Sequence, residues 1–180
     1  MGAKAEGPAM VSKGINIRLG NIPAELKTLD QWVCWKPIQR EGKTTKLPYN
    51  PKTGKQADST APSTWGTIQE ALIATERYGF PGIGFVFSKD DPYCGIDFDK
   101  CFDPKTGELE AWAQRYVDLF RSYTEITPSG AGLHIVLKGQ LPERPGKKGT
   151  GRRKGKFEAY DRARFFTFTG NLLNGNGNRA

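Results

Sequence analysis

The sequence of 180 residues lacks the features that mark several classes of protein. It has no run of about 18 apolar residues, which a membrane-spanning helix requires. Residues 1–6 carry neither the apolar stretch of a signal peptide nor the Ser or Thr of a myristoylation signal. We therefore expect a cytoplasmic protein. The three cysteines form no Cys-x-x-Cys pair, which argues against a zinc knuckle and favours buried, reduced thiols at Cys34, Cys94 and Cys101.

The composition favours one folded domain with many turns. A domain of this length buries about 70% of the surface of its unfolded chain. Ten Phe, six Tyr and four Trp supply core material, and 22 Gly and 12 Pro argue against a simple helical bundle. The net charge of +8 makes a polyanionic partner plausible. We expect a flexible leader over residues 1–20, a folded domain over 21–171 and a disordered, Asn/Gly-rich tail over 172–180.

Hydrophobic periodicity predicts interleaved helices and strands, which indicates an α+β fold. Residues 43–60 are predicted to form a loop, and the strands at 82–87 and 94–100 to form a hairpin. Pro37 is expected to stop the first strand, and Ser63 or Thr64 to cap the second helix. The predicted strands are 31–37, 82–87, 94–100, 123–126, 133–137, 157–160 and 164–168, and the predicted helices are 22–29, 63–79 and 108–120.

Two carboxylates alternate with apolar residues near the middle of the chain. In a strand, Ile96 and Phe98 would face the core, whereas Asp97 and Asp99 would project from the other face, roughly 6.5 Å apart. Two like charges this close favour a cation between them, and carboxylates are ligands of Mg²⁺ or Mn²⁺. Taken alone, such a pair is more often two solvated acids at the exposed end of a strand than a metal site.

His134, the only histidine, is predicted on the face of its strand opposite Leu133 and Ile135. It follows the loop Ser129-Gly130-Ala131-Gly132, whose backbone N–H groups could bind an anion. A histidine beside such a loop can donate to a triphosphate. A structural histidine is the alternative.

Glu158 could complete a site of three carboxylates, with Asp161, at the end of the strand, as the competing candidate. Arg162 and Arg164 suit phosphate or a template strand, because Arg makes bidentate contacts to phosphate. Lys46, in the predicted loop, could also meet a phosphate.

Most of the excess positive charge lies in residues 143–156, which carry seven basic residues against one Glu. We expect residues 146–156 of this segment to clamp template or primer DNA through sequence-tolerant phosphate contacts. Its candidate DNA-binding residues, together with Arg162, are Lys147, Lys148, Arg152, Arg153, Lys154 and Lys156.

Three segments, in this order, resemble the motifs of the bifunctional primase-polymerase domain, a branch of the archaeo-eukaryotic primase superfamily found in phage and plasmid replication proteins. They are residues 95–99 (GIDFD), 129–134 (SGAGLH) and 157–160 (FEAY), the last followed by Arg164. The likeness extends over roughly residues 28–171, through 31–35 (QWVCW), 46–51 (KLPYNP), 82–86 (GIGFV) and 164–170 (RFFTFTG).

The resemblance implies a core in which an RRM-like antiparallel or mixed sheet packs with a second α/β subdomain. It implies that Asp97, Asp99 and Glu158 bind two divalent cations, Mg²⁺ or Mn²⁺, and that His134 contacts the phosphates of the incoming nucleotide. The reaction would be template-dependent attack of a primer 3′-hydroxyl on the α-phosphate of an NTP or dNTP. Residues expected to bind the nucleotide are Ser129, Gly130, Gly132, His134, Tyr160, Arg164 and Lys46.

The same resemblance implies a DNA template and primer, a helicase domain or partner, and a monomer in a bacterial, archaeal or phage-infected cell. De novo priming stays open, because many relatives carry a helical bundle after the third motif. The alternative function is a non-catalytic, RRM-like module that binds single strands. A metal-dependent nuclease or glycosyltransferase is a further alternative, since Asp-x-Asp occurs in those enzymes too.

Overall fold

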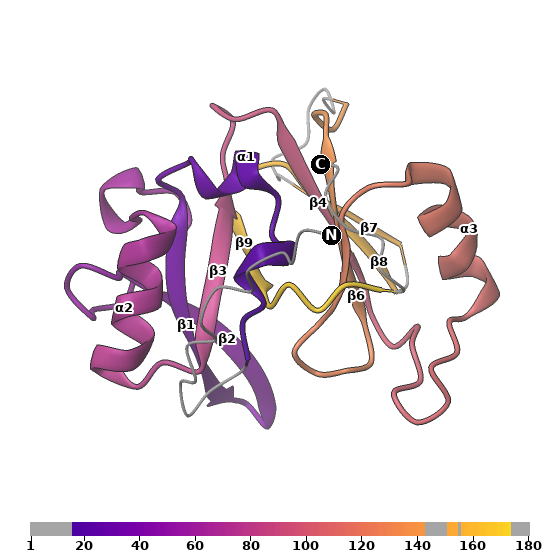
Figure 1. The fold of residues 1–180 in the computed structure, drawn as a ribbon, viewed down its shortest axis with the longest axis horizontal. Helices are drawn as coiled ribbons and strands as arrows, with labels where there is room; N and C mark the ends of the chain where they lie inside the picture. The colour runs from indigo at the N-terminus through magenta and orange to yellow at the C-terminus, as the bar shows by residue number, and fades with distance from the viewer. Residues whose placement is uncertain (1–15, 143–150, 155, 174–180) are drawn as a thin grey trace, which may run out of the picture.

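The computed structural model describes residues 16–142, 151–154 and 156–173, with only the backbone of 151–154. Two antiparallel sheets lie side by side, with strand orders β2-β1-β3-β9 and β5-β6-β4-β8-β7. Helix α2 packs on the first sheet and α3 on the second, so the two helices lie at opposite ends of the molecule (Figure 1). This arrangement confirms the predicted α+β class. Within the described ranges, no helix is long and apolar enough to cross a membrane.

The elements follow the chain with short connections. The helices are η1 (Leu19–Asn21), α1 (Ala24–Lys27), η2 (Pro62–Thr64), α2 (Ile68–Tyr78) and α3 (Ala111–Phe120). The strands are β1 (Trp32–Arg40), β2 (Lys43–Tyr49), β3 (Gly82–Phe87), β4 (Tyr93–Phe98), β5 (Thr124–Ile126), β6 (Leu133–Lys138), β7 (Gly151–Lys154), β8 (Phe157–Tyr160) and β9 (Arg164–Phe168).

Helix α2 begins later than predicted. Thr67 rather than Ser63 or Thr64 is its N-cap, and the Thr67 side chain and the Glu70 carboxylate form a reciprocal capping box. Residues 62–64 form the separate 3-10 turn η2. The helix ends as expected at Gly79, which adopts the left-handed conformation with φ 67°.

The first two strands also differ from the prediction. β1 continues through Pro37 to Arg40, and β2 occupies part of the segment predicted to be a loop. Pro37 is tolerated because β3 pairs with β1 only from Trp32 to Trp35. On that side Pro37 therefore faces an open edge, where its missing N–H costs no ladder hydrogen bond.

β3 and β4 do not form the predicted hairpin, because they belong to different sheets. β3 pairs with β9 in the first sheet, whereas β4 pairs with β8 in the second. The chain turns between them at residues 88–92, where the Asp91 carboxylate accepts hydrogen bonds from the backbone N–H groups of Ser88 and Tyr93 and from the Gln31 amide. Residues 161–163 make the matching crossing from β8 to β9. These four strands thus form a bent antiparallel ribbon that joins the two sheets.

The faces of the second sheet divide as the alternation in the sequence predicts. Ile96, Phe98, Leu133 and Ile135 pack with Ala113 and Val117 of α3. The opposite face packs against the first sheet through Tyr93, Tyr123 and Val136, close to Phe87 and Phe166. All three cysteines are buried and free, as predicted.

Candidate active site

A row of ionisable residues crosses the second sheet on the face that meets the first sheet. Glu125 of β5 is the register partner of His134 of β6, His134 that of Asp97 of β4, and Asp97 that of Glu158 of β8. Residues directly opposite each other in a sheet project from the same face. The structure therefore brings together Asp97, His134 and Glu158, which the sequence predicts on three separate strands.

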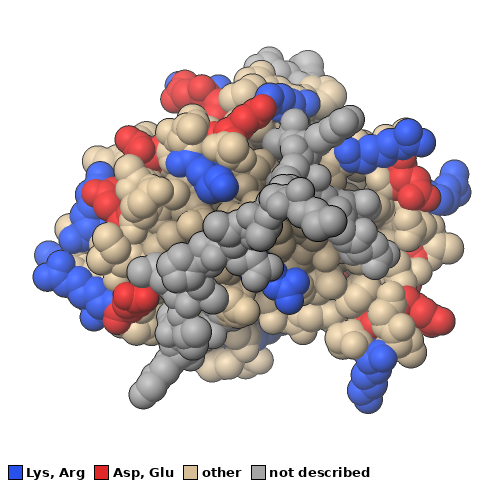
Figure 2. Space-filling model, viewed as in Figure 1, with Lys and Arg blue, Asp and Glu red and all other residues tan. Residues whose placement is uncertain are grey.

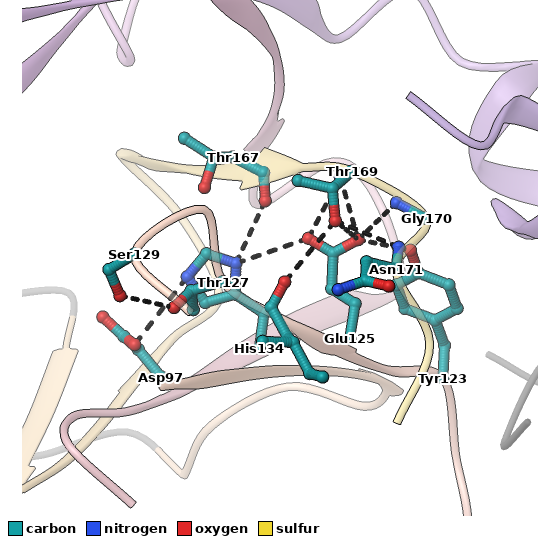
Figure 3. A network of polar contacts seen from close by, with 11 residues as sticks. Asp97, Tyr123, Glu125, Thr127, Ser129, His134, Thr167, Thr169, Gly170 and Asn171 are labelled. Carbon is teal, nitrogen blue, oxygen red and sulfur yellow. Dashed lines mark hydrogen bonds and ion pairs between the residues drawn. The ribbon is translucent and has the colours of Figure 1, made fainter. Parts of the chain in front are cut away.

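The ring of His134 is buried and held from several sides (Figure 3). Its Nδ1 lies 3.0 Å from the backbone carbonyl oxygen of Thr167 on β9. Because a carbonyl can only accept, Nδ1 carries the proton and donates. The ring stacks on Phe166 with centroids 4.5 Å apart. Nε2 consequently faces Asp97, whose Oδ1 is 3.7 Å away.

Glu125 completes the row, and the sequence reading did not identify it. Its side chain is fully buried, and its Oε1 lies 3.8 Å from Nδ1 of His134. It accepts hydrogen bonds from the Tyr123 hydroxyl and from the backbone N–H groups of Thr169 and Gly170. The usable signal was its place in a strand joined by a tight loop to the strand of His134, since a hairpin puts such residues opposite each other.

The environment of Asp97 is unfavourable for its negative charge. Burial raises the pKa of the Asp97 carboxyl, and the charges of Asp99 and Glu158 raise it further, whereas His134 and Lys46 act in the opposite direction. Asp99 lies just beyond β4, is exposed, and donates its backbone N–H to the Lys156 carbonyl. The carboxylates are thus within electrostatic reach of one another, and a cation would relieve their repulsion.

The side chains of these carboxylates are not grouped around a common metal position in the structure. Among the residues whose side chains are described, no three His, Cys, Asp or Glu side chains are grouped so as to hold a metal ion. Glu158 instead accepts a 2.5 Å hydrogen bond from the Tyr160 hydroxyl. The charge of the site fits a divalent cation, but the predicted third ligand is turned toward Tyr160.

The two candidates for the third carboxylate lie in different surroundings. Glu158 is opposite Asp97, whereas Asp161 lies at the crossing to β9, where its charge acts on Asp91 and Cys94. Asp161 is buried and accepts hydrogen bonds from the Arg162 guanidinium and the Leu141 N–H. The structure therefore places Glu158, not Asp161, beside the Asp97 carboxylate. Arg162, a predicted DNA contact, is engaged by Asp161.

A cavity of about 480 Å³ opens beside Asp97 and His134. Its other walls are residues 44–48 of β2, residues 163–167 of β9 and the preceding turn, and Ser59; they include Lys46 and Arg164. The Lys46 ammonium lies over the Trp35 ring, and the Arg164 guanidinium lies over the Tyr160 ring. Burial lowers the pKa of Lys46, although nearby carboxylates, among them Asp97, oppose this shift. Cationic and anionic side chains thus meet in one cleft, as a nucleotide with bound cations would require.

The predicted Ser-Gly-x-Gly loop connects β5 to β6 next to this row. Gly130 has φ 75°, and the Ser129 hydroxyl is hydrogen-bonded to that of Thr127, 2.9 Å away (Figure 3). A Cβ on Gly132 would lie 2.6 Å from the Phe98 carbonyl oxygen, so this glycine is needed for close backbone approach. The cavity walls described above do not include Ser129, Gly130 or Gly132.

Most of the predicted basic clamp lies beyond what can be described. Lys147 and Lys148 lie outside the described residues, and Arg152, Arg153 and Lys154 are described only as backbone of the edge strand β7. Lys156 is exposed and forms an ion pair of 2.8 Å with Glu110. On the face drawn in Figure 2, most Lys and Arg side chains lie around the rim with Asp and Glu among them, and a few lie nearer the centre.

Comparison with known proteins gives one informative relative. No family model matches the chain. The DNA primase-polymerase of Nitratiruptor phage NrS-1 is 42% identical to it over 156 residues, which are 86% of this chain and 21% of that protein. The chain thus spans about a fifth of the length of this curated relative. The similarity confirms the resemblance that the sequence motifs indicate, to a primase-polymerase domain of the phage type.

Proposed function

We propose that this chain, a primase-polymerase domain of the phage type, is a template-dependent nucleotidyltransferase that extends a DNA primer with NTPs or dNTPs. The observation that carries the proposal is the in-register row of Asp97, His134 and Glu158 beside a cleft lined by Lys46 and Arg164. Carboxylates for cations and basic groups for phosphates are the two components that nucleotidyl transfer needs.

The basic side chains of the cleft would hold the triphosphate. His134 presents Nε2 to the cleft, since Nδ1 is occupied by the Thr167 carbonyl. Arg164 offers a fork of donors suited to phosphate oxygens, and Lys46 offers a compact positive charge. Together these groups would orient the α-phosphate toward the primer 3′-hydroxyl, which attacks as pyrophosphate leaves.

Asp97, Asp99 and Glu158 are the residues that would hold divalent cations, Mg²⁺ or Mn²⁺. Bound cations supply charge neutralisation at the attacking and leaving oxygens in reactions of this class. Glu158 would take part once its bond to Tyr160 is exchanged. The raised pKa of Asp97 supports this assignment, because burial and neighbouring negative charge disfavour its carboxylate in the absence of a cation.

Primer extension tests the proposal directly. A labelled primer on a DNA template is incubated with dNTPs or NTPs and with Mg²⁺ or Mn²⁺, for the wild type and for Asp97→Asn and Asp99→Asn. Asp90→Asn is the matched control, because Asp90 is an exposed carboxylate in the turn before β4. We expect extension by the wild type and the control, and loss of extension to background in the other two variants. Full activity of an Asp97→Asn, Asp99→Asn double variant would refute the assignment.

The assay also separates the competing functions. DNA binding without incorporation under either metal would favour a non-catalytic module, and degradation of the labelled strand would favour a nuclease.

The basic clamp is tested by neutralising Arg152, Arg153 and Lys154 together. This triple variant should bind DNA more weakly and with a flatter dependence on salt, since fewer counterions are released. Normal binding at all salt concentrations would contradict the clamp.

A further inference from the structure

Glu125 is the feature of the site that the proposed chemistry does not use. Its carboxylate is fully buried and receives the Tyr123 hydroxyl at 2.6 Å, the Thr169 N–H at 2.9 Å and the Gly170 N–H at 2.8 Å. All of these groups donate, which suits an ionised carboxylate, because that form only accepts. A buried charge is costly unless it is paired. The ring of His134 is also within reach, with its Nδ1 at 3.8 Å from Oε1 of Glu125.

The contacts of Glu125 reach His134 by two routes. The direct route is the attraction between the carboxylate and the Nδ1–H group. The indirect route runs through the backbone, because Glu125 binds the N–H groups of Thr169 and Gly170, two and three residues after Thr167. The carbonyl of Thr167 is the acceptor of the His134 Nδ1–H. Glu125 therefore fixes both the ring and the chain segment to which the ring is bonded (Figure 3).

We propose that Glu125 is a positioning residue for nucleotidyl transfer, which acts on the nucleotide only through His134. It keeps Nδ1 turned away from the cleft, so that Nε2 faces Asp97 and the nucleotide phosphates. The inference rests on the proposed function in one respect, namely the contact of His134 with those phosphates. Loss of the carboxylate would remove one of the contacts that orient the ring and would weaken the hold on the nucleotide.

Single-nucleotide incorporation tests this coupling with Glu125→Gln, His134→Ala and the double variant. The measured quantities are KM for the dNTP, kcat, Kd for primer-template and Tm. We expect Glu125→Gln to reduce kcat/KM for the dNTP by on the order of 10-fold, with Kd for DNA unchanged. In the His134→Ala background the same change should have less than about a twofold further effect, since residues that act through one another are non-additive.

Tyr123→Phe is the matched control. It removes one donor to Glu125 but keeps the carboxylate and the stacking of the ring on Phe168. It should lower Tm and leave kcat/KM unchanged, which separates a general loss of stability from loss of positioning. If Glu125→Gln does not fold, Glu125→Asp keeps the charge and shortens its reach, and should give a smaller fall in kcat/KM. Unchanged kinetics in a folded variant, or effects that multiply in the double variant, would overturn the proposal.

A spectroscopic readout separates failure of this proposal from failure of the proposed function. His134 is the only histidine in the sequence, so the ring ¹⁵N resonances of an untagged protein belong to it alone. We expect a protonated, hydrogen-bonded Nδ1 that changes in Glu125→Gln and persists in Tyr123→Phe. If the wild type incorporates no nucleotide but this pattern holds, the enzymatic function fails while the positioning stands. A ring signature indifferent to Glu125→Gln overturns the positioning itself.

Discussion

Gly95 provides a sharp test of how the two sheets are packed. A Cβ at this position would lie 2.5 Å from carbon atoms of both Phe87 and Phe166, whereas ordinary van der Waals contact begins at 3.4 Å. Phe87 belongs to β3 and Phe166 to β9, so both rings come from the first sheet while Gly95 lies in the second. Gly95→Ala must therefore displace two aromatic rings at the point where the sheets meet.

The cost of that displacement follows from the packing. Overpacking of a filled core destabilises by about 1–3 kcal/mol, which for a chain of this size corresponds to a fall in Tm of about 2–12 °C. The effect should extend to the site, because Phe166 stacks on His134. We expect a higher KM for the nucleotide as well as a lower Tm.

Thermal and chemical denaturation measure the stability change, with Gly20→Ala as control. A Cβ at Gly20 would meet nothing within 4 Å, so this variant should stay within about 0.5 kcal/mol of the wild type. Phe87→Leu should partly relieve the clash, so the double variant should be more stable than the sum of the single changes indicates. A Gly95→Ala protein with the Tm of the wild type would refute this account of the packing.

Three further outcomes follow from the structure. Burial raises the pKa of Asp97, so the metal-free wild type should lose stability as pH rises above the ordinary range of Asp. Asp97→Asn should show neither this loss nor a rise in Tm on addition of Mn²⁺. An equal effect of Mn²⁺ on the Tm of both proteins would contradict a metal site at Asp97. Burial raises the pKa of Cys34 to about 12 and the pKa values of the other two thiols to about 11. Maleimide labelling at neutral pH should therefore require unfolding. Rapid labelling of the native protein would show that the thiols are accessible and reactive. Arg162→Ala should lower the free energy of unfolding by about 1 kcal/mol, because it removes hydrogen-bond donors from the buried Asp161. The Kd for DNA should not change. A weaker Kd with an unchanged Tm would instead make Arg162 a DNA contact.

The position of Asp97, His134 and Glu158 on one face could be predicted because strand alternation is local. Each lies between apolar neighbours whose side chains pack in the core, so the face from which its own side chain projects is determined by adjacent residues. Glu125 obeys the same alternation, yet its burial could not be read from the sequence. A glutamate is almost never fully buried unless it is paired, and its donors come from residues 169 and 170, over 40 positions away.

Strand pairing was the part of the fold that the sequence did not specify. The apolar strands at 82–87 and 93–98 and the turn between them look like a hairpin, because alternation predicts a face but not a neighbour. The difference depends on the Asp91 carboxylate, which binds three donors and turns the chain into the second sheet. The prediction that Pro37 ends the first strand was wrong for a related reason. The effect of a proline on a strand depends on whether another strand lies on the side of its backbone nitrogen.

The bent ribbon of β3, β4, β8 and β9 connects the two sheets that form opposite walls of the cleft. Its two crossings, at 88–92 and 161–163, lie close together, since the charge of Asp161 acts on Asp91. The cleft takes Lys46 and Arg164 from one side of this bend and Asp97 and His134 from the other. A small change in the bend angle would therefore alter the width of the cleft.

At the corner, Ala163 holds a left-handed φ of 54°, a conformation that L residues other than glycine adopt at a cost. The inside of the bend is filled by Phe87, Phe166 and the bare backbone of Gly95. The inside of the bend is thus packed with side chains, and the bend sets the spacing between the groups that would hold phosphate and those that would hold cations.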